Sequence, residues 1–409
     1  MDQFHISTKT VEITQVKNRN VFLVIALISS TVLGCSSDSG STIATIDPGS
    51  SLRVQLQKLV DDAVESGLPG VSLHVQDRGE SISVVAGVAN RDTAEPVTPS
   101  SLFHAGSIGK TFVATMLLRL VDMGYLQLDD PIDLWLDPSM SSMIADSNRI
   151  TIRMLLSHTS GIQDYFSNPD YGIAFAESPG KIWTPTENLG YIDNTQNNFE
   201  PGAEFSYSNT NYLLLGVIAE RITGLSLGMA LRQWVFDPAG LENTYGAYEN
   251  LGQPEIAHGY LPISFLENSS LNIELPTDGS DLDTFEWLES EGLGDAPIQS
   301  TSGDLNSFIR TLIDTDTLIS DELKTQMQTE SFPGSSEHGF GLYILHNGFD
   351  NSLRFMHGGK SFGLISSMSY TPSEDSSFTM IANASFGDYD ELFGDYINRL
   401  FLILERSRR

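Results

Sequence analysis

The stretch "HAGSIGKTF", from His104 to Phe112, joins a serine flanked by glycines to the start of an apolar run. Apolar side chains then recur with the spacing of a helix, at Phe112, Val113, Met116, Leu117 and Leu120. We therefore expect Ser107 to lie at the N-terminus of a helix. Lys110 follows Ser107 by about one helical turn on the same face, so its amine can approach the serine hydroxyl.

The pairing of Ser107 with Lys110 has a chemical meaning only in a suitable environment. A serine hydroxyl is a weak nucleophile until a base removes its proton. A lysine is such a base only where burial or neighbouring positive charge lowers its pKa. The helix N-terminus adds partial positive charge, which favours an anionic serine. Ser-x-x-Lys alone is a common pattern, and a capping serine followed by a surface lysine fits it equally well.

A nucleophile elbow is a second chemical interpretation of the same stretch. "AGSIG" (105–109) has the second glycine of Gly-x-Ser-x-Gly and an alanine in place of the first. An elbow needs a parallel sheet built from βαβ units, with an acid and a histidine following in order. The rest of the chain does not show that alternation.

Regular patterns extend from this stretch towards both ends of the chain. "LRVQLQKLVDDAVES" (52–66) has helical spacing, and "GVSLHVQ" (70–76) and "SISVVAGVAN" (81–90) alternate as the strands of a hairpin. Residues 111–236 indicate helices broken by polar loops. The runs "FGLYIL", "SLRFMH", "LISSMSYT" and "SSFTMIANAS" are then β-rich, and a helix is expected from Tyr389 to about Leu404. We expect an α/β (α+β) domain over residues 52–404, with a mixed, mainly antiparallel sheet flanked by the terminal helices and a mostly helical insertion at roughly 111–300.

The charge of the chain restricts its partners. Its 409 residues include 22 basic and 53 acidic ones, a formal net charge of −31, so we expect it to repel nucleic acid. No lysine or arginine occurs between Arg232 and Arg310, while acidic residues recur throughout 233–309. Such a run is usually a solvated loop; the alternative is an acidic rim or flap beside a cleft.

The N-terminal residues resemble a bacterial lipoprotein signal. Lys17 and Arg19 precede the apolar run "VFLVIALISSTVLG" and Cys35, the only cysteine of the chain. The run is short for a membrane span, and "VLGC" resembles a lipobox, which implies removal of residues 1–34 and lipidation of Cys35. Residues 35–51 then form a flexible tether. Ser36 resembles the signal for the outer membrane, so we expect a protein of the bacterial cell envelope that faces the periplasm; a plain secretory signal is the alternative.

Two more motifs give Ser107 and Lys110 a family context. "PGAEFSYSNTNYLLLG" contains Tyr207-Ser208-Asn209, and "FMHGGKSFGLISSMSYTP" contains His357-Gly358-Gly359. In this order the three motifs resemble Ser-x-x-Lys, Tyr-x-Asn and Lys/His-x-Gly of the serine hydrolases of the β-lactamase and penicillin-binding-protein superfamily. The resemblance is strongest to the branch of class C β-lactamases, D-Ala-D-Ala carboxypeptidases and related esterases. "LLSHTSGI" (155–162) and "STSGDLNSFIR" (300–310) resemble further blocks of that family, so the likeness covers about 52–404.

The resemblance implies a role for each motif residue. Ser107 is the expected nucleophile, Lys110 and Tyr207 share the removal of its proton, and the ammonium of Lys110 lowers the pKa of Tyr207. Asn209 is expected to hydrogen-bond Lys110 and the substrate, and the backbone N–H groups of Ser107 and Lys360 to hold the oxyanion. The substrate-binding set is Asn209, His357, Gly358, Gly359 and Lys360. No cofactor or metal is implied, the partner is a small ester, amide or peptide, and His158 is expected to be structural.

Two departures from the family pattern bear on the substrate. His357 stands where many relatives have lysine, and Gly358 lacks the hydroxyl that many of them offer to a substrate carboxylate. Both favour an esterase or a D-Ala-D-Ala carboxypeptidase-like enzyme over a β-lactamase. Because side chains alternate along a strand, Gly358 and Lys360 share one side, and we expect the Lys360 ammonium to face the substrate there. A catalytically inactive, penicillin-binding-like sensor or scaffold is the alternative.

Overall fold

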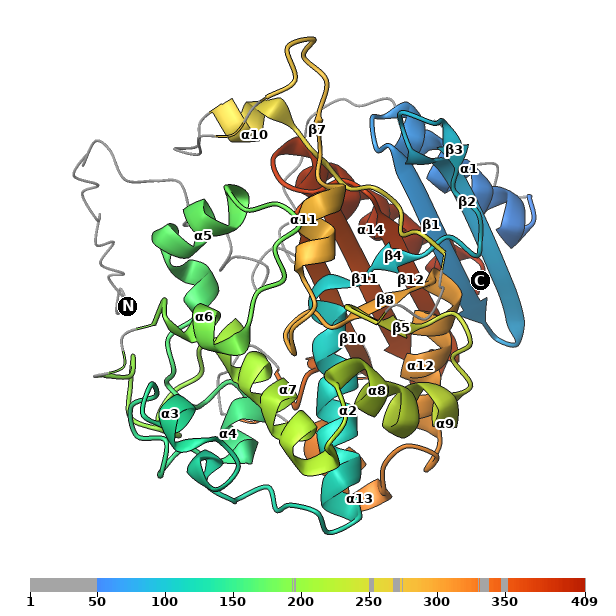
Figure 1. Cartoon of the computed structure of the whole chain (residues 1–409). Helices are drawn as coiled ribbons and strands as arrows, with labels where there is room; N and C mark the ends of the chain where they lie inside the picture. Colours follow the sequence, from blue (N-terminus) through green and yellow to red (C-terminus); the bar gives the residue numbers. More distant parts are fainter. Residues whose placement is uncertain are drawn as a thin grey trace, which may run out of the picture.

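A seven-stranded antiparallel sheet forms the centre of the fold, and it combines strands from the early and the late parts of the described chain (Figure 1). The computed structural model describes residues 50–192, 194, 196–249, 254–267, 273, 275–329, 331, 338–346 and 352–408. The predicted signal and Cys35 lie outside the described residues, as does the tether up to residue 49.

The strand order is β3-β2-β1-β12-β11-β10-β9, and β1 pairs with β12 although the two are far apart in sequence. The strands are β1 (Gly70–Asp77), β2 (Glu80–Asn90), β3 (Glu95–Pro96), β9 (Tyr343–His346), β10 (Leu353–Ser361), β11 (Leu364–Thr371) and β12 (Ser376–Ala382).

The terminal helices cover one face of this sheet, as the sequence predicts. α1 (Leu52–Glu65) and α14 (Asp388–Arg406) pack against each other, and their apolar residues form a separate core with those of β1 and β12. Leu59 of α1, Leu73 of β1 and Leu400 of α14 are all fully buried there. α12 (Ser302–Asp314) lies against β1, β11 and β12. The sheet is therefore a layer between helices (Figure 1).

The inserted region is mostly helical and is organised around α2 (Gly109–Asp122). α2 packs against α7 (Asn209–Thr223) and α8 (Leu227–Leu231), and its Phe112 ring stacks on Phe308 of α12, with centroids 3.6 Å apart. Because α2 has neighbours on most sides, it is buried well beyond the apolar stripe expected from the sequence. The other described helices are α3 (Pro138–Ser141), α4 (Ile152–Leu156), α5 (Pro169–Ala176), α6 (Pro185–Leu189), α9 (Asp237–Ala239), α10 (Ile263–Glu267), α11 (Phe285–Ser290) and α13 (Asp321–Met327). Short strands make two small sheets, β4 (Phe103–His104) with β8 (Ile298–Ser300) and β5 (Tyr245–Gly246), and β6 (Tyr260–Leu261) with β7 (Leu282–Asp283).

β10 differs from the sequence-based boundary in a way that matters for the site. The apolar pattern ended at His357, whereas β10 continues to Ser361 and pairs with β11 as far as Leu364. The two glycines weaken the local strand signal, but pairing with β11 supplies the backbone hydrogen bonds that hold them in the sheet. Residues 357–360 are therefore strand residues.

In the described part of the chain, no single helix is long and apolar enough to cross a bilayer. A bent pair, α7 followed by Leu227–Ala239, is long and apolar enough by length and composition alone.

Candidate active site

Ser107 and Lys110 are in direct contact at the start of α2. Ser107 is half-buried in a 3₁₀ turn (Gly106–Ile108) that leads straight into the helix. Lys110 is 1% exposed, and its Nζ lies 2.9 Å from Ser107 Oγ and donates to the backbone oxygen of Asp295 at 2.7 Å. Burial lowers the pKa of Lys110 to about 8, although nearby carboxyl groups act in the opposite direction. The serine hydroxyl thus has a neighbouring amine that can lose its proton near neutral pH.

The nucleophile elbow is excluded by this arrangement. Every strand pair of the seven-stranded sheet is antiparallel, and the residue before the 3₁₀ turn is not the end of a parallel strand. Ser107 therefore belongs to the Ser-x-x-Lys arrangement.

Tyr207 lies beside this pair, just before α7. Its ring stacks on the imidazole of His158 with centroids 4.3 Å apart, and Lys110 Nζ is 5.3 Å from the ring centre. Burial raises the pKa of Tyr207 far above its ordinary value, and a hydrogen bond with Ser107 opposes this only in part. We expected the pKa of Tyr207 to be lowered by Lys110; in the structure it is raised, and desolvation by burial is the largest cause. Burial thus shifts the two pKa values in opposite directions, upward for Tyr207 and downward for Lys110.

Asn209 is held by Asp164, a residue that the sequence analysis did not identify. The backbone N–H of Asn209 donates to Asp164 Oδ1, and its amide Nδ2 donates to Oδ2, both at 3.1 Å. The expected hydrogen bond from Lys110 to Asn209 is not formed; Lys110 bonds to Ser107 and Asp295 instead. A carboxylate beside the first residue of α7 is favoured by the partial positive charge of the helix N-terminus. Burial raises the pKa of Asp164 to about 6.

The side of β10 that faces Ser107 carries His357 and Gly359. His357 is 1% exposed, and its Nδ1 donates to the carbonyl of Gly358 at 2.6 Å. Burial lowers the pKa of His357 to about 3, so the imidazole is neutral. A Cβ on Gly359 would lie only 2.1 Å from the carbonyl oxygen of Ala105, so strand and turn are in close contact. Neutral His357 gives this wall no positive charge for a substrate carboxylate.

Lys360 contributes its backbone to the site and directs its side chain elsewhere. A Cβ on Gly106, whose φ is +56°, would come within 2.8 Å of the Lys360 nitrogen. The two predicted oxyanion donors therefore lie on segments that touch. The Lys360 ammonium, however, pairs with Asp390 of α14 and lies 4.0 Å from the centre of the Phe386 ring. The expectation that this ammonium faces the substrate is wrong, because strand alternation turns residue 360 away from the side of His357 and Gly359.

Part of the acidic segment 233–309 belongs to the site. Besides the contact of its carbonyl with Lys110, Asp295 accepts a hydrogen bond from the Tyr165 hydroxyl at 2.8 Å. Glu291 lies 3.9 Å from His104 Nδ1, and burial raises its pKa to about 8. His104 in turn accepts a hydrogen bond from the N–H of Gly106 at 3.2 Å. In the sequence, only the acidic run without basic residues indicated that carboxyl groups of this segment could lie beside the site.

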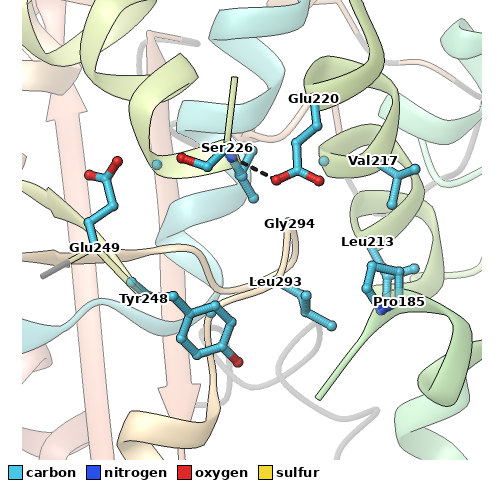
Figure 2. Close-up of a pocket in the computed structure, with 14 residues that line it drawn as sticks. Pro185, Leu213, Val217, Glu220, Ser226, Tyr248, Glu249, Leu293 and Gly294 are labelled. Atoms are coloured by element: carbon cyan, nitrogen blue, oxygen red, sulfur yellow. Dashed lines mark hydrogen bonds between the residues drawn. The ribbon is translucent and has the colours of Figure 1, made fainter. Parts of the chain in front are cut away.

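A pocket on the other side of the same segment contains none of the motif residues (Figure 2). It is lined by one side of α7, including Leu213 and Glu220, and by Tyr248, Glu249 and the loop 292–294. Glu220 accepts a hydrogen bond from the N–H of Leu227 at 2.8 Å. The loop 292–294 that lines this pocket directly precedes Asp295.

Comparison with known proteins agrees with this geometry. The profile of a family described as Beta-lactamase matches residues 56–400. The chain belongs to the beta-lactamase family. This family member is 26% identical to Penicillin-binding protein 4 of Amycolatopsis lactamdurans, over 82% of this chain and 87% of the relative. It is 31% identical to Esterase EstB of Burkholderia gladioli, over 49% of this chain and 55% of the esterase. The crystal structure of D-amino acid amidase from Ochrobactrum anthropi SV3 with L-phenylalanine amide superposes with a TM-score of 0.73 at 27% identity, over 88% of this chain and all of that one.

Proposed function

We propose that this family member is a serine hydrolase that forms an acyl-enzyme on Ser107 and acts on small esters or amides. The contact of Lys110 Nζ with Ser107 Oγ carries the proposal, because it joins a nucleophile to a buried base. The names of the relatives, which include an esterase, a penicillin-binding protein and an amidase, support the same class of reaction. Retention of the contact argues against an inactive sensor or scaffold.

The reaction uses Lys110 as the base in both halves. Neutral Lys110 takes the proton of Ser107 as Oγ bonds to the substrate carbonyl carbon. The N–H groups of Ser107 and Lys360 hold the resulting oxyanion; one such donor typically contributes about 3 kcal/mol to transition-state stabilisation. The intermediate collapses, and the leaving group departs with the proton carried by Lys110. Lys110, neutral again, then takes a proton from water as the water oxygen bonds to the acyl carbon. The bond from that carbon to Ser107 Oγ breaks, Lys110 returns the proton to Oγ, and the carboxylic acid leaves. Tyr207, which stays protonated, donates a hydrogen bond to Ser107 Oγ as negative charge develops there.

The charges around the site favour substrates without a carboxylate. His357 is neutral, Gly358 has no hydroxyl, and the ammonium of Lys360 is paired with Asp390. Asp164 and Asp295 lie near Lys110, and their ionised forms repel an anionic substrate. We therefore favour an esterase or amidase over a D-Ala-D-Ala carboxypeptidase or a β-lactamase, whose substrates carry a carboxylate.

Removal of the nucleophile tests the proposal. In Ser107→Ala we expect turnover of p-nitrophenyl butyrate and labelling by a fluorophosphonate to fall by at least about 1,000-fold. The melting temperature should stay the same, because a half-buried serine contributes little packing. Ser178→Ala, at a half-buried serine outside the site, is the matched control. Labelling of Ser107→Ala at the wild-type rate would refute the assignment.

A comparison of substrates tests the finer part of the proposal. Nitrocefin carries a carboxylate, so its kcat/KM should be at least about 100-fold lower than that of the butyrate ester, the equivalent of losing one charge-assisted contact. Nitrocefin turnover as efficient as ester turnover would show that another group binds the carboxylate.

A further inference from the structure

Three buried histidines form a cluster behind Tyr207 and Lys110. His158, His338 and His357 are each at most 1% exposed. The ring centroids of His158 and His338 are 5.1 Å apart, and those of His338 and His357 are 6.4 Å apart. His158 also supports the Tyr207 ring. The segment that carries His338 has no motif in the sequence analysis, so this residue is new to the site.

The partner of each Nδ1 atom determines the tautomer of each ring. His158 Nδ1 accepts a hydrogen bond from the backbone N–H of Ser208 at 3.2 Å, which leaves its proton on Nε2. His338 Nδ1 lies 2.8 Å from the carbonyl oxygen of Gly339, and the corresponding distance from His357 to Gly358 is 2.6 Å. A carbonyl oxygen only accepts, so His338 and His357 carry their protons on Nδ1. The cluster therefore presents one Nε2–H donor and two Nε2 lone pairs.

None of these three Nε2 atoms has a hydrogen-bond partner among the described residues. Leaving a buried polar group without a hydrogen bond is unfavourable, so the three Nε2 atoms of this cluster call for a partner. A single partner for all three atoms has to accept one hydrogen bond and donate two. A water molecule does this, and buried waters typically make about three hydrogen bonds.

A metal ion does not fit the same atoms. A cation needs lone pairs, and the protonated Nε2 of His158 has none to offer. In agreement with this, no group of three or more His, Cys, Asp or Glu in the described part of the chain is arranged to hold a metal.

We propose that His158, His338 and His357 bind one buried water molecule, which accepts from His158 and donates to the other two. The water ties the His357 ring of β10 to the His158 ring beneath Tyr207. His338 is thus a positioning residue for the catalytic groups. The water site stands by itself, whereas the positioning role rests on the proposed hydrolase function.

The water site is tested by crystallography and by NMR of the histidine side chains. We expect solvent density within about 2.7–3.2 Å of all three Nε2 atoms. Long-range ¹⁵N spectra should show His158 as the Nε2–H tautomer and the other two as Nδ1–H. Burial lowers the pKa of His338 to about 4, so this imidazole is neutral at pH 7 and its tautomer can be observed there. Direct contact between two Nε2 atoms, a bound metal, or a different tautomer pattern would overturn the proposal.

The positioning role is tested with His338→Phe and His338→Gln. Phenylalanine removes the hydrogen bond to the water, whereas glutamine places an amide near the position of Nε2. We expect fluorophosphonate labelling of Ser107 to slow by about tenfold in the first variant, the equivalent of one lost hydrogen bond, and to recover to within about twofold in the second. His346→Phe, at an exposed histidine of β9, is the control for the substitution itself.

The possible outcomes separate the two claims. Equal labelling rates in wild type, His338→Phe and His338→Gln would refute the positioning role. Slow labelling in both variants would show that His338 acts through its shape and would refute it as well. If the wild-type chain is not labelled at all, the proposed function fails, while the density and the tautomers still decide the water site.

Discussion

The charge state of Lys110 controls the proposed reaction at the scale of single residues. With a pKa of about 8, the neutral amine is a small fraction at low pH and becomes the main form above pH 8. We expect kcat/KM for p-nitrophenyl butyrate to rise about tenfold per pH unit below pH 8 and to level off above it. A pH–rate profile measures this. Lys110→Arg, which stays charged, should be inactive throughout, and a midpoint well below pH 8 would contradict Lys110 as the base.

The protonation of Glu291 makes the stability of the fold depend on pH. Burial raises its pKa from 4.5 to about 8. Between these values the folded protein holds a proton that the unfolded chain has released, so stability falls as pH rises through this window. Ionisation of this one group changes the free energy of unfolding by at most about 1.4 kcal/mol for each pH unit. In urea unfolding at pH 5 and pH 8, Glu291→Gln should therefore gain stability over wild type as pH rises. Glu242→Gln, at an exposed position, is the control and should not gain stability in this way. Identical pH dependence of stability in wild type and Glu291→Gln would contradict the raised pKa of Glu291.

The contact between β10 and the 3₁₀ turn is the critical feature at the scale of elements. In Gly359→Ala the new Cβ would lie 2.1 Å from the Ala105 carbonyl and force strand and turn apart. Because this moves Lys360 N–H relative to Ser107, we expect at least about a 100-fold loss of kcat and a lower melting temperature. Gly358→Ala is the matched control for stability, since its Cβ would meet only the Ser366 carbonyl oxygen, at an ordinary 3.6 Å. Equal melting temperatures in the two variants would contradict the close contact.

The anchoring of the chain is a question for the whole molecule. We propose that Cys35 is lipidated and that the chain is held in the bacterial cell envelope, at the outer membrane and facing the periplasm. Cys35→Ser should then move the protein from the membrane fraction to the soluble fraction, as measured by fractionation and immunoblotting. Ser36→Ala, which keeps the cysteine, should remain with membranes. Wild-type protein found wholly in the soluble fraction would refute the anchor.

The sequence and the structure agree best where the signal is local. Helical spacing in 52–66, alternation in 70–90 and the β-rich run 364–371 all predicted elements that the structure contains. Each of these patterns reflects one element that buries one side, so its period is visible within a few residues. β10 was predicted too short, because its glycines are held in the sheet by pairing with β11, which no local pattern encodes.

By itself, the sequence determined the fold class, the family and the central pair, because the order of three short motifs and the spacing of Ser107 and Lys110 are properties of the chain. Only the tertiary structure decided the electrostatics around that pair. The acceptor of Lys110 lies 185 residues away at Asp295, Asp164 rather than Lys110 holds Asn209, and Asp390 binds the ammonium of Lys360. The pKa values of Lys110 and Tyr207 follow from burial by many segments at once. Such contacts depend on how distant elements pack and how much water they exclude, and neither is written in any single stretch of sequence.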